Sequence, residues 1–330
     1  MLSICIPAYT YVDYTAEAVK SILAQDVDVE LVVVEDFDFL GSDHPEHARI
    51  APVRDLLASD PRVKWISANV RRPIQQNWNF TVAQATRPFI KVMGADDRLR
   101  PGALARLTDI LQTNPDVHLL GHLGVIIDQH GHVVRHLSPY VADRAPVMLQ
   151  PVQALKLKLR QVARFREPAC NVYSKEVWQA VGGYSEDFRF CFDVHFNARV
   201  MARVPSLLLS EELCELRRHQ GSDGALLPAT LALDELAALV QVMLDLLGAS
   251  ATASDRYHAQ ALVAYRVIEL AAARAHGSLL KVLGFIWAER HRIPLSPRML
   301  AIVLAALYRR ASKGDVQKTM PDAQFVLRLD

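Results

Sequence analysis

The sequence lacks an excess of charge of either sign, with 37 lysines and arginines against 36 acids in 330 residues. This balance argues against nucleic acid as a partner, because nucleic-acid-binding proteins carry a basic surface. Cysteine is also scarce: the four cysteines lie far apart in sequence, and none forms a Cys-x-x-Cys pair. We therefore expect free thiols in a reducing compartment, rather than a disulfide framework or a zinc site.

Long apolar runs are missing as well. The longest, at 299–308, is too short to cross a bilayer and is typical of a buried helix. The first residues, MLSICIPAY, lead straight into an apolar strand, with no basic leader and no small-residue cleavage site. We therefore expect a cytoplasmic protein, and a position peripheral to the inner face of the membrane is an alternative.

Strand and helix patterns alternate over the first 140 residues. Strands are predicted at 2–8, 29–36, 62–68 and 88–94. Helices are predicted at 13–25, 75–85 and 100–115. The segment 117–136 is typical of two strands around a turn. This order predicts an α/β fold with a Rossmann-like, mostly parallel sheet flanked by helices.

The texture of the sequence changes near residue 225. Alanine- and leucine-rich segments with helical spacing follow, at 227–248, 254–277 and 296–311. We predict one domain over 1–224 and an all-helical region over 225–330. A modest basic bias at the end of this region is interpreted as a solvated helix face, with a membrane-surface patch as the alternative.

Two adjacent acids, Asp96 and Asp97, directly follow the strand at 88–94. Ligands of parallel sheets bind at the carboxyl ends of the strands, which places this pair on one rim with Pro7–Tyr9 and Glu35–Asp36. Neighbouring carboxylates repel each other unless a cation lies beside them, and oxygen ligands suit Mg²⁺ or Mn²⁺. The alternative is that Asp97 caps a helix or turn.

Several segments in a fixed order extend this pattern. A first strand ends in PAY, a second ends in ED, a later one ends in GADD, and GGYSEDFRFCFDVHFNAR places an acid before a helix with Arg. Over residues 1–222 the chain resembles family 2 inverting glycosyltransferases of the GT-A fold. The resemblance implies a nucleotide-diphosphate sugar donor of the UDP or dTDP type, a hydroxyl-bearing acceptor, and Mn²⁺ or Mg²⁺. It also implies a place in polysaccharide or glycoconjugate biosynthesis.

The resemblance implies roles for particular residues. Asp97 matches the acid that ligates the metal on the diphosphate, and Asp96 the acid near the ribose and the metal. Asp193 matches the general base that deprotonates the acceptor, although it could instead cap a helix. His219 falls where relatives have a loop histidine near the metal. The nucleotide sugar would contact Pro7, Tyr9, Asp36, Asn69, Arg71, Asn77, Asp96 and Arg218.

Other polar residues have weaker assignments. Arg217, like Arg218, could pair with phosphate oxygens, because an arginine fork matches them. Asn77 and Asn79 could equally be helix-surface residues. Five histidines are interpreted as solvated edge positions rather than as a metal site, because no cysteine joins them: His118, His122, His130, His132 and His136.

The sequence departs from the family pattern in places. Thr10 stands where the family usually has Asn, Phe192 stands where it has Glu, and EDFDFLGSDH is bulkier than the usual acidic loop. These departures keep a non-catalytic, sugar-nucleotide-binding or scaffold protein open as an alternative. A sugar-phosphate nucleotidyltransferase is a second alternative, but the first loop, PAYTYVDYT, lacks the glycines of a phosphate-binding loop. The region 225–330 is expected to contact an acceptor, a second copy of the chain or a membrane surface.

Overall fold

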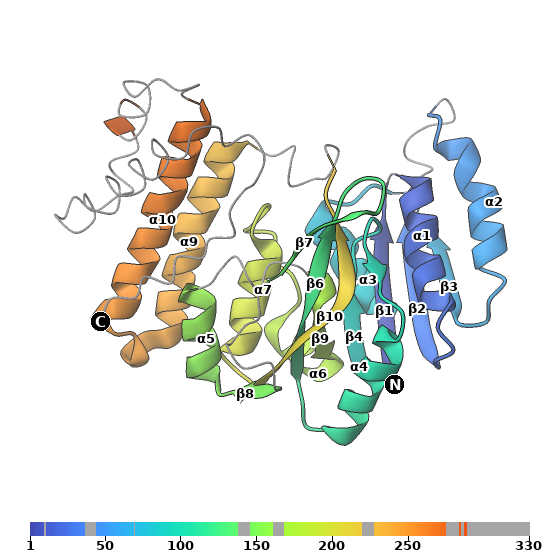
Figure 1. The fold of residues 1–330 in the computed structure, drawn as a ribbon, viewed down its shortest axis with the longest axis horizontal. Coiled ribbons are helices and arrows are strands. Elements are labelled where there is room, and N and C mark those ends of the chain that lie inside the picture. Colours follow the sequence, from blue (N-terminus) through green and yellow to red (C-terminus); the bar gives the residue numbers. More distant parts are fainter. Residues whose placement is uncertain are drawn as a thin grey trace. The chain divides into compact units, whose positions relative to one another are not determined.

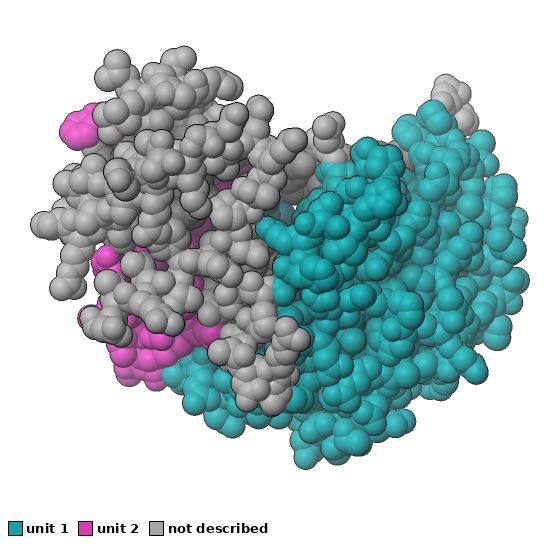
Figure 2. Space-filling model, viewed as in Figure 1, with its two compact units in different colours: residues 1–155, 164–226 teal, residues 156–163, 227–330 magenta. Residues whose placement is uncertain are grey.

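The computed structural model describes residues 1–9, 11–36, 44–68, 70–137, 146–160, 168–219 and 228–274, together with residues 284, 287 and 288. The chain divides into two compact units, which Figure 2 colours separately. One unit comprises residues 1–155 and 164–226, and the other comprises residues 156–163 and 227–330. The assignment of separate functions to residues 1–224 and 225–330 stays a prediction.

The first unit opens with the predicted alternation of strands and helices (Figure 1). Its strands are β1 (Leu2–Ala8), β2 (Val29–Glu35), β3 (Val63–Ser67) and β4 (Phe89–Val92). The helices between them are α1 (Val12–Leu23), α2 (His47–Leu57) and α3 (Ile74–Ala83). Of these three helices, α2 was not predicted from the sequence. It contains a proline and buries only Ile50 and Leu57, so its helical pattern is weak.

The second half of this unit is less regular. Its strands are β5 (Arg98–Leu99), β6 (Leu119–Ile127), β7 (Val133–His136), β8 (Val147–Leu149), β9 (Asn171–Ser174) and β10 (Ser206–Arg217). Its helices are α4 (Ala103–Thr113), the 3₁₀ turn η3 (Pro168–Cys170), α6 (Lys175–Val181) and α7 (Phe192–Met201). Helix α5 (Pro151–Arg160) begins in this unit, and its residues from 156 onward belong to the other unit. The predicted pair of strands within 117–136 corresponds to β6 and β7.

These strands form one ten-stranded sheet, with the order β3-β2-β1-β4-β9-β6-β10-β5 along its main path. Strands β1 to β4 are mutually parallel where they pair. Strand β9 is antiparallel to both β4 and β6, while β6 and β10 are parallel. Two antiparallel steps restore the original direction, so β10 runs the same way as β1, β2 and β4. The carboxyl ends of these four strands therefore lie along one edge of the sheet.

The central strands are continuous apolar runs in the sequence because they are buried on both faces. Every residue of β1 and of β6 is buried, because helices and loops cover both faces of the central strands. Helices α1 and α4 bury Ile22 and Leu107 in one cluster with Ile4 of β1. The structure confirms the predicted α/β class.

The second unit is helical where it is described. It contains α9 (Ala229–Leu247), the 3₁₀ turn η4 (Gly248–Ser250) and α10 (Ala253–Arg274), which match the predictions at 227–248 and 254–277. Asp255, whose side chain is fully buried, pairs with Lys156 at 3.1 Å and Arg160 at 3.2 Å. The helix predicted at 296–311 lies outside the described residues. Within the described part, no helix has the length and apolar character needed to cross a membrane.

Candidate active site

The two acids of the GADD segment lie in a tight turn after β4. The backbone N–H of Asp97 donates to the carbonyl of Gly94 at 3.2 Å. A Cβ atom at position 94 would lie 2.7 Å from Asp96 Oδ1 and 3.2 Å from Asp97 Oδ2. A larger residue at position 94 would push these carboxylates aside, and one oxygen of each converges on the same small region. The capping alternative for Asp97 is wrong for α4, whose N-cap is Gly102.

The end of β10 holds this turn from the other side. The backbone N–H of Arg217 donates to Asp97 Oδ1 at 3.0 Å, and Arg217 Nε donates to the carbonyl of Asp96 at 2.9 Å. Two residues further on, His219 Nε2 lies 3.1 Å from Asp96 Oδ2. The structure thus brings together Asp96, Asp97 and His219, which the sequence placed near one metal.

Arg217 is a buried cation, only 1% exposed, and each nitrogen of its guanidinium donates to a protein acceptor. Its guanidinium pairs with Glu17 at 2.6 Å and lies 4.3 Å from the ring centre of Tyr14. The same group donates to the carbonyls of residues 128 and 129. Arg217 therefore positions the carboxylate turn instead of presenting its charge to a phosphate. Its neighbour Arg218 is exposed, and its NH1 group donates to the carbonyl of Arg217 at 3.1 Å.

Two tyrosines that the sequence did not single out surround His219. The ring centres of Tyr11 and Tyr14 lie 4.9 and 5.3 Å from that of His219. Tyr11 has φ 63°, and it is the one residue other than glycine with a positive φ in the described chain. Bulky side chains avoid this left-handed conformation, so the fold keeps Tyr11 there at an energetic cost. No local sequence pattern predicts the cluster of Tyr11, Tyr14 and His219, because its members come from opposite ends of the unit's sequence.

A second group of side chains lies at the end of β2. Asp36 is 1% exposed, and none of the described groups donates a hydrogen bond to its Oδ1 atom. Burial raises the pKa of Asp36 to about 6, against the opposing charge of Arg71. The Arg71 guanidinium lies 4.1 Å from the ring centre of Tyr9. A buried carboxylate oxygen without a donor is costly and marks a place where a ligand can donate.

The other residues predicted to contact the nucleotide sugar differ in their surroundings. Pro7 is buried within β1 opposite Val34. Asn77 is 7% exposed, and its Oδ1 atom accepts no hydrogen bond from the described residues. Asn79 exchanges two hydrogen bonds with the backbone of Tyr184, so it fixes that loop. Asn69 lies outside the described residues.

Asp193 stands in the first turn of α7, whose N-cap is Cys191. Its Oδ1 atom accepts the backbone N–H of Val194 at 2.7 Å, and the side chain is half-buried. The charge of Asp193 adds to burial in raising the pKa of Tyr173, which places the carboxylate near that ring. Phe192, at the position of the usual Glu, packs edge-on against Trp78 and Tyr184. At this position the chain therefore has an aromatic contact in place of the charged side chain that the family usually has.

The arrangement of the chain has counterparts among solved structures. TarS of S. aureus in complex with UDP-GlcNAc has a TM-score of 0.60 and 14% identity, covering 94% of this chain and 87% of that chain. The mannosyltransferase PcManGT from Pyrobaculum calidifontis, in complex with GDP-Man and Mn²⁺, has a TM-score of 0.51 and 15% identity, covering 95% and 88%. At these identities the likeness shows the fold alone, which is the GT-A fold.

Sequence comparison gives the family. The sequence model described as Glycosyl transferase family 2 matches residues 3–182, and this chain belongs to that family. An uncharacterized glycosyltransferase of Nostoc sp., alr2836, is 31% identical over 156 residues, which are 45% of this chain and 45% of that protein. The uncharacterized protein MT1568 of Mycobacterium tuberculosis is 25% identical over 228 residues, 66% of this chain and 67% of that protein. The matched region thus spans less than half of the Nostoc protein. The predicted family and fold are confirmed, and membership in a glycosyltransferase family argues against the nucleotidyltransferase alternative.

Proposed function

We propose that this chain is a metal-dependent inverting glycosyltransferase that moves a sugar from a nucleotide-diphosphate sugar to an acceptor hydroxyl. One observation carries the proposal: Asp96, Asp97 and His219 come together at the rim of the sheet. Arg217, which holds the two aspartates, is buried and hydrogen-bonded to both of them. A site assembled from β4 and β10 at the carboxyl ends of parallel strands is where this fold binds ligands.

The residues fit a divalent cation. Asp96 Oδ1 and Asp97 Oδ2 converge beside Gly94, and two carboxylates without a cation would repel each other. Carboxylate oxygens are the ligands that Mg²⁺ and Mn²⁺ prefer. Asp97 would be the direct ligand, with Asp96 and His219 beside it. When bound, the metal neutralises the charge that develops on the diphosphate leaving group. PcManGT, which shares this fold, has Mn²⁺ in its complex, and this likeness in fold supports the proposal.

Asp36 would receive the base. An ionised carboxylate only accepts hydrogen bonds, and the imino N–H of uracil or thymine would donate to Asp36 Oδ1, which fits a UDP- or dTDP-type donor; the N1–H of guanine would donate in the same way. Arg71, whose guanidinium lies over the ring of Tyr9, would contact the nucleotide beside Asp36. The UDP-GlcNAc bound to TarS agrees with a uridine nucleotide, although GDP-Man in PcManGT shows that the fold takes others.

Asp193 would act as the general base. Its carboxylate accepts the proton of the acceptor hydroxyl while that oxygen attacks the anomeric carbon on the face opposite the diphosphate, which inverts the configuration. Asp193 lies in the first turn of α7, where a helix N-terminus favours a negative charge. The acceptor would be a polysaccharide or glycoconjugate precursor in the cytoplasm. Residues 225–330 would contact that acceptor, a second copy of the chain or the membrane surface.

A thermal-shift screen of UDP-, dTDP- and GDP-sugars, each with and without Mn²⁺, tests the proposal, because a ligand of the native state raises Tm. We expect UDP- or dTDP-sugars to raise Tm most, and only with Mn²⁺. We also expect those that raise Tm to be hydrolysed slowly in the absence of acceptor. Binding with no turnover under any condition would favour the non-catalytic alternative, and the absence of any shift would contradict the proposal.

A further inference from the structure

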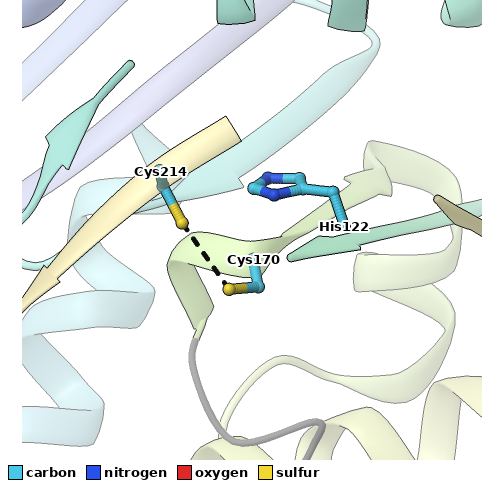
Figure 3. A group of neighbouring side chains, drawn as sticks. All are labelled: His122, Cys170 and Cys214. Carbon is cyan, nitrogen blue, oxygen red and sulfur yellow. Dashed lines mark hydrogen bonds between the residues drawn. The ribbon is translucent and has the colours of Figure 1, made fainter. Parts of the chain in front are cut away.

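A second group of reactive side chains lies inside the sheet, away from the rim. His122 of β6, Cys170 at the end of η3 and Cys214 of β10 face one another (Figure 3). Lys91 of β4 contacts the same group, and none of the four residues is more than 4% exposed. The sequence-based interpretations of His122 as a solvated edge residue, and of the cysteines as unrelated to it, are therefore wrong. The cause is strand pairing between β9, β6 and β10, which joins positions far apart in the sequence.

The geometry of the three ligand atoms suits a tetrahedral ion. The sulfurs of Cys170 and Cys214 lie 3.6 Å apart, and these atoms and a ring nitrogen of His122 all lie within 4.8 Å of one another. Two sulfurs bonded to one tetrahedral zinc at about 2.3 Å are separated by about 3.8 Å. The cysteines thus already have nearly the spacing that the ion requires.

The imidazole of His122 has the orientation of a metal ligand. Its Nδ1 atom lies 2.8 Å from the carbonyl of Leu123, which leaves Nε2 as the nitrogen with the lone pair. Metal-ligating histidines commonly donate their second ring N–H to a backbone carbonyl in this way. Nε2 faces Lys91 Nζ at 2.7 Å, and this amine also donates to the carbonyl of Ala169.

The charges of the cluster also favour a cation. A thiolate is the form of cysteine that binds a metal. Two thiolates balance the charge of one Zn²⁺, which gives a neutral complex suited to a dry interior.

We propose that His122, Cys170 and Cys214 bind one Zn²⁺ ion, which would displace Lys91 Nζ from His122 Nε2. On binding, the ion takes the lone pair of His122 Nε2, and any protons on the two sulfurs pass to solvent. The three ligands are buried, and the site would be filled as the chain folds. The ion would tie together β6, η3 and β10. This proposal does not depend on the glycosyltransferase activity.

The test measures metal content in the full-length chain. Protein produced in zinc-supplemented medium and dialysed is analysed by inductively coupled plasma mass spectrometry. We expect about one zinc per chain in the wild type and a loss of at least tenfold in Cys170→Ala and Cys214→Ala. Cys5→Ala, which removes a buried thiol elsewhere, is the matched control and should retain the metal. Asp97→Ala should also retain it, which separates this site from the rim.

A second measurement works even where a variant fails to fold. Wild-type protein produced with Co²⁺ in place of Zn²⁺ should show a thiolate-to-cobalt charge-transfer band in the near ultraviolet, which carboxylate ligands do not give. Wild-type protein with no zinc and no such band would overturn the proposal. Zinc that persists in Cys170→Ala and Cys214→Ala but is lost in Asp97→Ala would also overturn it, as would a Cys170–Cys214 disulfide in the wild type.

Discussion

The two halves of the sheet are built differently. The β3-β2-β1-β4 half consists of parallel strands that pair mostly with near neighbours in sequence, and it contributes the buried carboxylate of Asp36 at the end of β2. The β9-β6-β10-β5 half mixes directions and joins distant segments, and it contributes Arg217 and His219. The candidate active site forms where the halves meet, since Asp96 and Asp97 follow β4 but are held by residues from the end of β10.

The two halves therefore have different expected roles: the first binds the donor, and the second positions the groups of the active site. The first half presents groups with unused hydrogen-bonding capacity, such as Asp36 Oδ1. The second half presents groups that are already engaged, such as the guanidinium of Arg217. We therefore expect substitutions in the two halves to affect different measurements: the affinity for the donor in the first, and turnover together with stability in the second.

The largest effect is expected where the halves meet. Asp97→Ala removes the proposed direct metal ligand, and losing several kcal/mol of transition-state stabilisation should lower kcat by about 10³-fold or more. Steady-state kinetics of transfer or of donor hydrolysis measures the effect. Asp109→Ala, which removes an exposed acid of α4 paired with Arg106, is the control and should stay near wild-type activity. A kcat within tenfold of wild type in Asp97→Ala would remove Asp97 from the metal site.

Asp193→Asn should come next. The amide keeps the shape of the side chain but cannot take a proton, so kcat should fall by about 10² to 10⁴. The Kd of the donor, measured by calorimetry, should change by less than about twofold, because Asp193 is proposed to act on the acceptor. If turnover remained normal in Asp193→Asn, another residue would have to be the base.

Arg217→Lys tests the positioning role of the second half. Lysine keeps the charge but loses the planar fork that reaches Asp96, Glu17 and the nearby carbonyls. We expect a loss of about 2–4 kcal/mol in the free energy of unfolding and a drop of about tenfold to a hundredfold in kcat. Chemical denaturation and kinetics measure both. Arg203→Lys, at an exposed arginine, should leave stability unchanged. A stable but inactive Arg217→Lys variant would point to direct contact with substrate instead.

The smallest effect on turnover is expected in the first half. Asp36→Asn should raise the KM for a uridine donor by about tenfold, with kcat little changed.

Burial raises the pKa of Asp36 to about 6, so the ionised carboxylate destabilises the ligand-free fold above pH 6, and this cost disappears as pH falls below about 4. Asp36→Asn should therefore be more stable than wild type by about 1–3 kcal/mol at pH 8, and equally stable near pH 4. Denaturation curves at the two pH values check this, and equal stability at pH 8 would contradict the buried charge.

The sequence predicted the first half well because its information is local. Strands buried on both faces are continuous apolar runs, and the acids that end them mark the rim. Strand β10 was missed because glutamates at 211 and 212 interrupt its apolar pattern, where the pairing with β6 also shifts register. The engagement of Arg217, the ring cluster around His219 and the His122–Cys170–Cys214 group all arise from long-range pairing. The hydrophobic pattern of a single segment cannot predict contacts between residues that lie far apart in the sequence.

The central claim is that the turn between β4 and α4 holds a divalent cation together with a nucleoside diphosphate. Calorimetric titration of UDP, with and without Mn²⁺, into wild type and Asp97→Asn tests it most directly, because the metal and the nucleotide must then bind cooperatively. We predict that Mn²⁺ tightens UDP binding by about tenfold or more in the wild type and by less than about twofold in Asp97→Asn. The same enhancement in both proteins would contradict the account.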